Sequence, residues 1–266
     1  MDRPRRHLFL LRELVKRDFR GRYAGSLLSF LWSFVQPLFM LGLFTFVFGT
    51  ILELKLEMMG ADRRMAGTDS FGIFLFCGLL PWTAVQEGVQ RSATAITDNA
   101  TLVKKLQFPT EILILSVVIG ALLHQAIAAG VFVVILAAVG ELAWASLPWL
   151  LLVVPLQAGL TLGLGLLLAS AQVFFRDTSQ VVGMALMGWF YLTPIVYPLE
   201  MVPDGLRGLV EANPLTPVVE LYRTALLGAR FRLVPEAIGL AVAAAVLAAV
   251  GVWLFRKLRP AFVDEI

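Results

Sequence analysis

Few residues in this sequence have the types and spacing that catalysis or metal binding requires. The 266 residues include two histidines, His7 and His124, and one cysteine, Cys77. Structural metals are held by His and Cys ligands at characteristic short spacings, which do not occur here. A lone cysteine in an apolar stretch is typical of a small buried hydrophobe. We therefore predict no catalytic residue, no metal site and no internal disulfide.

Acidic residues offer the other route to chemistry. A membrane-embedded enzyme needs acids, bases or a metal near the lipid headgroups. The possible sites are Glu53, Glu57 and Asp62 in one polar segment and the Arg176-Asp177 pair in another. Neither H-E-x-x-H nor G-x-S-x-G occurs. A transferase that acts on polyprenyl-linked sugars remains an alternative with little support.

The chain also lacks the usual means of using energy. It has no Gly-Lys pair and hence no Walker A motif, so it does not bind ATP in the P-loop manner. His124, followed by Gln125, is the titratable residue that lies well inside a long apolar interval. Interhelical hydrogen bonding is favoured there over a proton relay. If transport is driven, the sequence indicates that a partner drives it.

Membrane spans are the elements that must position these residues. The chain is 59% hydrophobic and 15% charged, with a mean hydropathy of +0.82, whereas soluble domains are about 45–50% apolar and about 25% charged. About 20 mainly apolar residues cross a hydrocarbon core of about 30 Å. Six intervals meet or approach this length: residues 30–52, 70–86, 112–140, 147–175, 178–199 and 237–255. We predict an all-α integral membrane protein, with the second interval weakest because Pro81 interrupts it and Asp69 and Glu87 bound it.

Basic residues predict the orientation. Of the 22 Lys and Arg residues, fifteen lie in the N-terminal segment, in the C-terminal tail and in the loops expected on the same side of the membrane as the termini. The other seven lie in the segments expected on the opposite side. Cytoplasmic loops are enriched in Lys and Arg. We therefore expect both termini to be cytoplasmic, as an even number of spans requires.

The cytoplasmic N-terminus, residues 1–29, contains a predicted amphipathic helix. Leu8, Leu11, Val15 and Phe19 recur at helical spacing, with basic residues on the other side. This pattern is typical of a helix that lies in the membrane interface. Its role is open between simple anchoring and the admission of a lipid-linked substrate, since a basic helix attracts phosphates.

Residues 30–266 form the predicted transmembrane domain, and residues 198–235 within it break the apolar pattern. Two short helical segments are expected near 203–211 and 216–227, joined at a turn marked by Asn213-Pro214. Neither segment is long enough to span. We predict a re-entrant or interfacial hairpin on the outer side, with an ordinary outer loop as the alternative.

The polar segment NATLVKKLQFPTE covers residues 99–111. It begins inside a predicted cytoplasmic loop, residues 92–110, and ends just before the next predicted span. It is long enough for a short helix that ends at the Phe-Pro step. Phe108 would present an apolar knob, and Lys104 and Lys105 a polar rim. A membrane protein that receives force from a soluble ATPase needs a protruding, rigid element of this kind.

Three stretches in order resemble the permease subunits of polysaccharide-exporting ATP-binding-cassette transporters. They are RDFRGRYAGSLLSFLWSFVQPLFMLGLFTFVFG, GLLPWTAVQEGVQRSATAITDNATLVKKLQFPTEIL, and FFRDTSQVVGMALMGWFYLTPIVYPLEMVP followed by NPLTPVVELYR. The resemblance implies export of a lipid-linked polysaccharide across the bacterial inner membrane by a homodimer with a central channel. It also implies two copies of a separate ATPase that binds ATP and Mg, with no cofactor in this chain and no nucleic acid partner.

The resemblance also implies roles for individual residues. ATPase coupling is carried onto Asn99, Leu102, Lys104, Lys105, Phe108 and Pro109. A gate near the lipid headgroups is carried onto Arg17, Arg20, Arg22 and Tyr23. The outer hairpin is shaped by Pro194, Pro198, Asn213, Pro214 and Arg223. The polar loop 54–69 departs from the family pattern, so no partner is assigned to it.

Aromatic residues near the Pro-broken segments could line a path on which sugar rings slide by their apolar faces. They are Trp82, Trp189, Phe190, Tyr191 and Tyr197. For each residue alone, anchoring at the membrane interface or packing is the competing interpretation. An exporter of the same architecture that moves a drug or a simple lipid also stays open.

Overall fold

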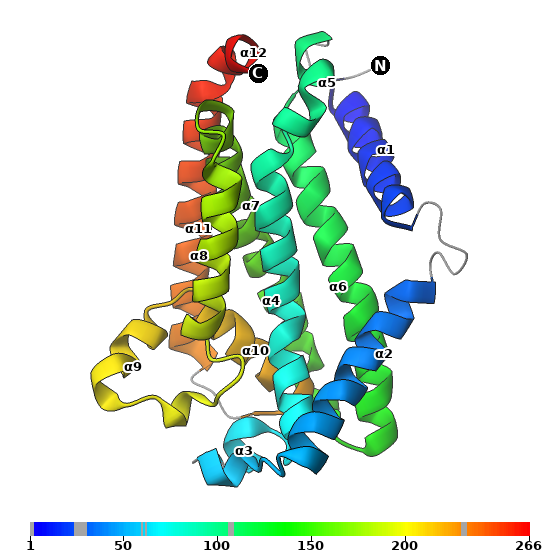
Figure 1. Ribbon diagram of the computed structural model, residues 1–266, viewed down its shortest axis with the longest axis vertical. Coiled ribbons are helices and arrows are strands. Elements are labelled where there is room, and N and C mark those ends of the chain that lie inside the picture. The colour runs from blue at the N-terminus through cyan, green and yellow to red at the C-terminus, as the bar shows by residue number, and fades with distance from the viewer. Residues whose placement is uncertain (1–2, 24–30, 60, 62, 106–108, 230–232) are drawn as a thin grey trace.

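The computed structural model describes residues 3–23, 31–59, 61, 63–105, 109–229 and 233–266. In these residues every regular element is a helix, and the β-contact present is an isolated bridge between Lys55 and Ser70. The predicted all-α class is confirmed. The long helices run side by side along the longest axis of the molecule (Figure 1).

Five helical segments in the described residues are long and apolar enough to cross a membrane. They are α2 (Trp32–Phe44) with the π-helix η2 (Thr45–Ile51), α4 (Phe71–Thr94), α6 (Glu111–Val139), η5 (Trp144–Trp149) with α7 (Leu150–Phe174), and α11 (Leu233–Leu258). These correspond to the first, second, third, fourth and sixth predicted intervals. The sequence pattern therefore located five helices that are candidates to cross a membrane.

The remaining predicted interval, 178–199, contains a shorter helix than expected. Helix α8 (Thr178–Leu192) has 15 residues, which at about 1.5 Å per residue is less than a core of about 30 Å. Thr193 is extended, with φ −99° and ψ 135°. Pro194 follows it, and a proline disfavours the helical region for the residue before it. The Thr193-Pro194 step explains where α8 ends.

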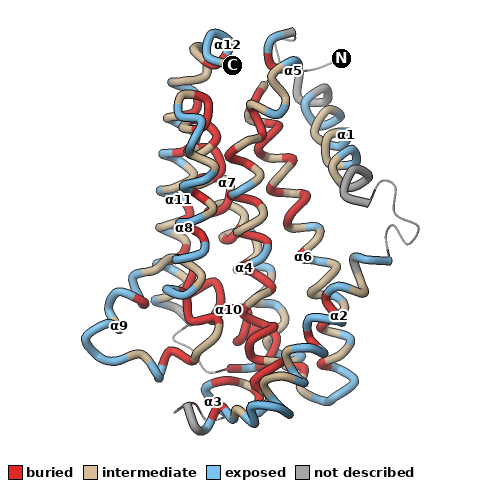
Figure 2. The backbone as a smooth tube through the Cα atoms, in the orientation of Figure 1, coloured by how far each residue is buried: buried red, intermediate tan, exposed pale blue. Residues whose placement is uncertain are grey.

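Helix α4, predicted to be the weakest span, is the most buried of the five and lies at the centre of the bundle (Figures 1 and 2). Pro81 lies inside α4 without ending it. The helix also continues eight residues beyond the predicted end at Gln86, to Thr94. Arg91, which lies beyond the predicted end of this span, is therefore a helical residue, and Glu87 and Arg91 project from the same helix.

Helices α7 and α11 approach each other at glycines. A Cβ atom at Gly163 would lie 2.5 Å from the carbonyl carbon of Leu247, and one at Gly251 would lie 2.6 Å from the Gly163 carbonyl oxygen. Side chains at these positions would force the backbones apart. Small residues allow such close approach in membrane helix pairs, and Gly163 and Gly251 have this role here.

The two ends of the bundle differ in their short elements. Both chain termini lie at one end, near α5 (Figure 1). This end carries α1 (Arg3–Tyr23), η4 (Thr97–Asn99), α5 (Ala100–Lys105), η7 (Arg259–Ala261) and α12 (Phe262–Glu265). The opposite end carries η3 (Leu56–Met59), α3 (Arg63–Ala66), η6 (Leu199–Met201), α9 (Asp204–Glu211) and α10 (Leu215–Leu227). We call these the terminal end and the hairpin end.

The predicted N-terminal helix and the predicted pair of short helices both exist. Helix α1 packs beside α6 (Figure 1), so part of its surface faces protein. Helices α9 and α10 occupy the two segments expected near 203–211 and 216–227. All 13 residues of α10 are buried, whereas Val210 is the buried residue of α9. The pair thus has one exposed and one enclosed helix.

Candidate functional site

A cavity of about 640 Å³ lies at the terminal end, between α1, the last turns of α4, η4 and the start of α6. Charged and hydrogen-bonding side chains contribute much of its wall. The lining includes Arg17 and Asp18 from α1, Glu87 and Arg91 from α4, and Asn99 from η4. This cavity brings together residues from the predicted gate helix and from the predicted coupling loop.

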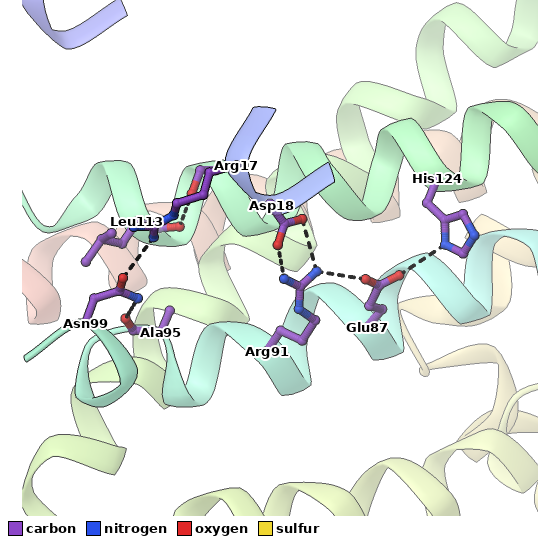
Figure 3. Close-up of polar contacts among 9 residues, drawn as sticks. Arg17, Asp18, Glu87, Arg91, Ala95, Asn99, Leu113 and His124 are labelled. Carbon is purple, nitrogen blue, oxygen red and sulfur yellow. Dashed lines mark hydrogen bonds and ion pairs between the residues drawn. The ribbon is translucent and has the colours of Figure 1, made fainter. Parts of the chain in front are cut away.

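A chain of charged contacts crosses this cavity (Figure 3). The Arg91 guanidinium donates to both carboxylate oxygens of Asp18 and, at 3.0 Å, to Glu87 Oε1. Glu87 Oε2 lies 3.4 Å from His124 Nδ1. The side chains of Asp18 and Arg91 are 16% and 36% exposed, so water screens this ion pair only partly. The chain links α1, α4 and α6.

A second polar contact joins α1 to the segment that leads into the coupling loop. Arg17 Nη2 donates to Asn99 Oδ1 at 2.9 Å, and Asn99 Nδ2 donates to the Ala95 carbonyl at 2.9 Å. The sequence placed Arg17 with the gate and Asn99 with the coupling loop. The structure brings these two groups into contact. The side chains of Arg20, Arg22 and Tyr23 lie outside the described part of the structure.

The predicted coupling residues are found around α5. Leu102 packs against a cluster of buried apolar side chains at the terminal end, and Lys104 is exposed. Pro109 is half-buried just before α6. Lys105 ends α5 with its side chain outside the description, and Phe108 lies outside the described residues. The short helix is confirmed, while its contact with another protein stays a prediction.

A second cavity, of about 360 Å³, lies between α2, α4 and α6. Most of its lining is apolar, but Glu87, His124 and Gln125 also contribute. Glu87 therefore lines both cavities. We expected His124 to be the titratable residue inside the spans. This is wrong, because the spanning helix α4 extends to Thr94 and also contains Glu87 and Arg91.

Buried amides join four helices at the middle of the bundle. Gln125 Nε2 donates to Tyr222 Oη at 2.8 Å, and Tyr222 donates to Gln157 Oε1 at 2.8 Å. Gln157 Nε2 in turn donates to the Pro81 carbonyl at 3.2 Å and to Gln125 Oε1 at 3.0 Å. This confirms the interhelical hydrogen bonding predicted for the His124-Gln125 pair.

The predicted channel aromatics form two groups. The rings of Trp82, Phe190 and Tyr191 follow one another edge to face, with centroids 5.5 and 5.1 Å apart. Trp82 is buried and Tyr191 is 64% exposed. Trp189 Nε1 instead donates to the Asn213 side chain, and Tyr197 Oη donates to the Tyr191 carbonyl near the end of α8. The 640 and 360 Å³ cavities have other linings, so a channel role stays a prediction.

Asn213 organises the turn that begins α10. Its Oδ1 atom accepts from Trp189 Nε1 at 2.8 Å and from the Leu215 backbone N–H at 3.0 Å. Its Nδ2 atom donates to Thr193 Oγ1 at 2.9 Å. Pro194 and Pro198 are buried nearby, and Pro214 precedes the first helical residue of α10. These contacts place the predicted hairpin residues around one turn.

Arg223 is the most enclosed charged residue that the structure describes. It is 1% exposed, and its guanidinium donates to the Pro194 and Ile195 carbonyls at 2.8 and 2.9 Å and to Glu220 Oε1 at 2.6 Å. The guanidinium carbon lies 3.5 Å from the centre of the Phe74 ring. Burial raises the pKa of the Glu220 carboxyl, and the neighbouring Arg223 charge opposes that rise. Arg223 therefore ties α10 to α4 and to the segment after α8.

The acidic residues weighed as alternative sites of chemistry are either exposed or outside the described residues. Within the described ranges, no group of three or more His, Cys, Asp or Glu residues is placed to hold a metal ion. Glu53 and Glu57 are exposed near the hairpin end, and Asp62 lies outside the described residues. Arg176 and Asp177 are exposed between α7 and α8.

The sequence analysis did not predict the ion pairs of four residues, which are Asp18, Glu87, Arg91 and Glu220. A signal for one pair was present, because Glu87 and Arg91 are four residues apart, the spacing at which helical side chains meet. Glu220 and Arg223 have the equivalent three-residue spacing. Asp18 had no such local signal, since its partner is 73 residues away.

Comparison with known proteins gives a similarity along nearly the whole chain. A family model described as ABC-2 type transporter matches residues 10–227. The chain is 31% identical over 261 residues to the O-antigen export system permease protein RfbA of Myxococcus xanthus, covering 97% of this chain and 95% of that protein. It is 27% identical over 256 residues to an RfbA of Klebsiella pneumoniae, covering 96% and 94%. It is 25% identical over 220 residues to the polysialic acid transport protein KpsM of Escherichia coli, covering 80% of each.

Proposed function

The chain belongs to the ABC-2 type transporter family, and from this premise we propose that it is the transmembrane subunit of an exporter for a lipid-linked polysaccharide of O-antigen or capsule type. The observation that carries this proposal is the similarity to O-antigen export permeases over 97% of the chain. The five helices that are long and apolar enough to cross a membrane are consistent with this role.

A separate ATPase supplies the energy in this proposal. The chain has no Walker A motif, so ATP and Mg bind to the partner and this chain holds no cofactor. The exporter contains two copies of this chain around a central channel and two copies of the ATPase. It moves its substrate across the bacterial inner membrane, with membrane lipids around it and no nucleic acid partner.

The proposed topology has six crossings with both termini in the cytoplasm. Helix α8 and the segment 193–199 together form the fifth crossing. Both termini lie at one end of the bundle (Figure 1), which an even number of crossings requires, and the Lys and Arg bias assigns that end to the cytoplasm. Helices α9 and α10 form a hairpin on the outer side, in which the enclosed α10 is re-entrant.

Residues at the two ends take different roles in export. Asn99, Leu102, Lys104, Lys105, Phe108 and Pro109 belong to the surface that meets the ATPase, with α5 as the protruding helix. Arg17, Arg20, Arg22 and Tyr23 mark the gate near the headgroups. Trp82, Trp189, Phe190, Tyr191 and Tyr197 border the route of the sugar chain, and closure of the two ATPases opens that route in steps.

A substitution in the coupling loop tests this function. Phe108→Asp places a charge on the proposed apolar knob, so export should be lost and ATP hydrolysis uncoupled while membrane insertion stays normal. Phe108→Leu keeps an apolar side chain and should retain export. Surface glycan, internal glycan and the amount of protein in the membrane are measured for both variants. Normal export by Phe108→Asp would remove the docking assignment.

The substrate class has its own test. Cells that lack this chain should accumulate radiolabelled glycan inside and lose it from the surface. Unchanged surface glycan would instead favour an exporter of a drug or a simple lipid. Turnover of a sugar-lipid donor by the purified chain alone would favour a transferase.

A further inference from the structure

Two neighbouring residues of α1 bind to one continuous segment of the chain. Asp18 pairs with Arg91 in the last turns of α4, and Arg17 donates to Asn99 in η4. The chain then runs directly from η4 into α5, the proposed coupling helix. The Asp18–Arg91 and Arg17–Asn99 contacts are therefore both made on the segment 91–99, immediately before α5 (Figure 3).

The geometry of these contacts is fixed from both sides. Asn99 Nδ2 is occupied by the Ala95 carbonyl, which leaves Oδ1 facing Arg17. Arg91 is held by Glu87 at the same time as it binds both oxygens of Asp18. Charge-assisted and two-point contacts have defined directions as well as strength. A displacement of segment 91–99 is thus transmitted to α1 in a defined direction.

The contacts of α1 with α6 are of a different kind. Leu10, Leu11 and Leu14 are partly buried and pack against an apolar cluster that includes Leu113 and Val118 of α6. Hydrophobic contact is non-directional, and packed helices can slide past each other by small shear movements. The surface between α1 and α6 therefore permits sliding that the contacts with segment 91–99 do not, once the 3.4 Å contact between Glu87 and His124 of α6 lengthens.

We propose that Arg17–Asn99 and Asp18–Arg91 form a clasp through which segment 91–99 positions α1, so that α1 moves with the coupling segment and slides along α6. The inference rests on the proposed function, since it takes α5 as the helix that receives force. Asp18 and Arg91 are positioning residues in this scheme. The 640 Å³ cavity is bordered by α6 as well as by the two clasped elements, so its shape changes during each cycle of the ATPase.

Paired cysteines test which surface of α1 moves. Leu14→Cys with Asp98→Cys allows a short thiol cross-linker to fix α1 to η4, while all four clasp residues stay in place. Leu14→Cys with Val117→Cys is the matched pair, because both positions line the same cavity but join α1 to α6. The native Cys77 is buried, with 0% exposure, so it does not compete for the reagent.

Export is measured as surface glycan in cells whose sole copy of the permease is the double-cysteine chain, before and after cross-linking. Cross-linking of Leu14→Cys to Asp98→Cys should leave export unchanged, because these elements move together. Cross-linking of Leu14→Cys to Val117→Cys should abolish export, because sliding is prevented. Loss of export in the first pair, or normal export in the second, would overturn the clasp.

The same cells separate failure of the clasp from failure of the proposed function. Before cross-linking, both chains should export glycan when the ATPase is present. If the wild-type chain with its ATPase carries no glycan, the proposed function fails whatever the cross-links do. If export is normal before cross-linking and the two pairs respond in the reverse order, the proposed function stands and the clasp is wrong.

Discussion

The two ends of the bundle use ion pairs in opposite ways. At the hairpin end, Arg223 and Glu220 are buried among backbone carbonyls and an aromatic ring. At the terminal end, Asp18 and Arg91 keep partial exposure and border a large cavity. Removal of one partner from a buried pair leaves a costly uncompensated charge, whereas exposed pairs exchange with water at little cost. The hairpin end is therefore built to stay in place and the terminal end is built to move.

The largest effect on stability is expected when the buried guanidinium of Arg223 is removed, and this tests the contrast between the two ends most directly. Arg223→Ala should destabilise the protein by about 3–5 kcal/mol, because Glu220 and two carbonyls lose their partner inside the protein. The recovery of monodisperse detergent-purified protein after heating measures the loss. Arg207→Ala, which removes the exposed pair with Glu211, is the matched control and should change stability by about 0–1 kcal/mol. Equal losses in the two variants would contradict the anchoring role of Arg223.

The buried amides between the two ends should give an intermediate effect. Gln157→Leu leaves Gln125 and Tyr222 short of a partner in an apolar setting and should cost about 1–3 kcal/mol. Gln90→Leu removes an amide from an exposed position of α4 and should stay within about 0.5 kcal/mol. Thermal inactivation of the two purified variants measures the difference. A Gln157→Leu chain as heat-resistant as the wild type would show that the network does not hold the helices together.

The smallest effect on stability is expected at the clasp. Asp18→Asn removes one charge, but Arg91 keeps Glu87 as a partner and both sites reach water, so the loss should be about 0–1 kcal/mol. The same heating assay measures it beside Arg223→Ala. A loss as large as that of Arg223→Ala would make the terminal end as fixed as the hairpin end, and the contrast between the ends would disappear.

Local patterns in the sequence predicted most of the helices because their causes are local. Apolar runs of sufficient length located five spans, and the turn at Asn213-Pro214 located the break between α9 and α10. The end of α8 was also readable, since Pro194 restricts Thr193, but the apolar run beyond it concealed that signal. Phe108, the central residue of the predicted docking surface, lies outside the described residues.

Long-range pairing explains what the sequence did not reveal. Glu87 and Asp69 made α4 look like a poor span, yet Glu87 is matched by Arg91 on its own helix and contacts His124 on α6. Arg223 was predicted to shape the outer hairpin with no partner named for its charge, and backbone carbonyls and Glu220 allow its burial. A hydropathy pattern scores each charged residue by itself and does not include a partner that is distant in the sequence. It therefore predicts that paired charges lie nearer to water than they do in the structure.

The glycine contact between α7 and α11 has a practical consequence for measuring motion. Because Gly163 and Gly251 leave no room for a side chain between the backbones, a change in that spacing would have to separate two closely interlocked helices. Spectroscopic labels on the outer faces of α7 and α11 should therefore keep a constant separation through the transport cycle. That pair can serve as an internal ruler against which displacements of α1 and the coupling segment are read.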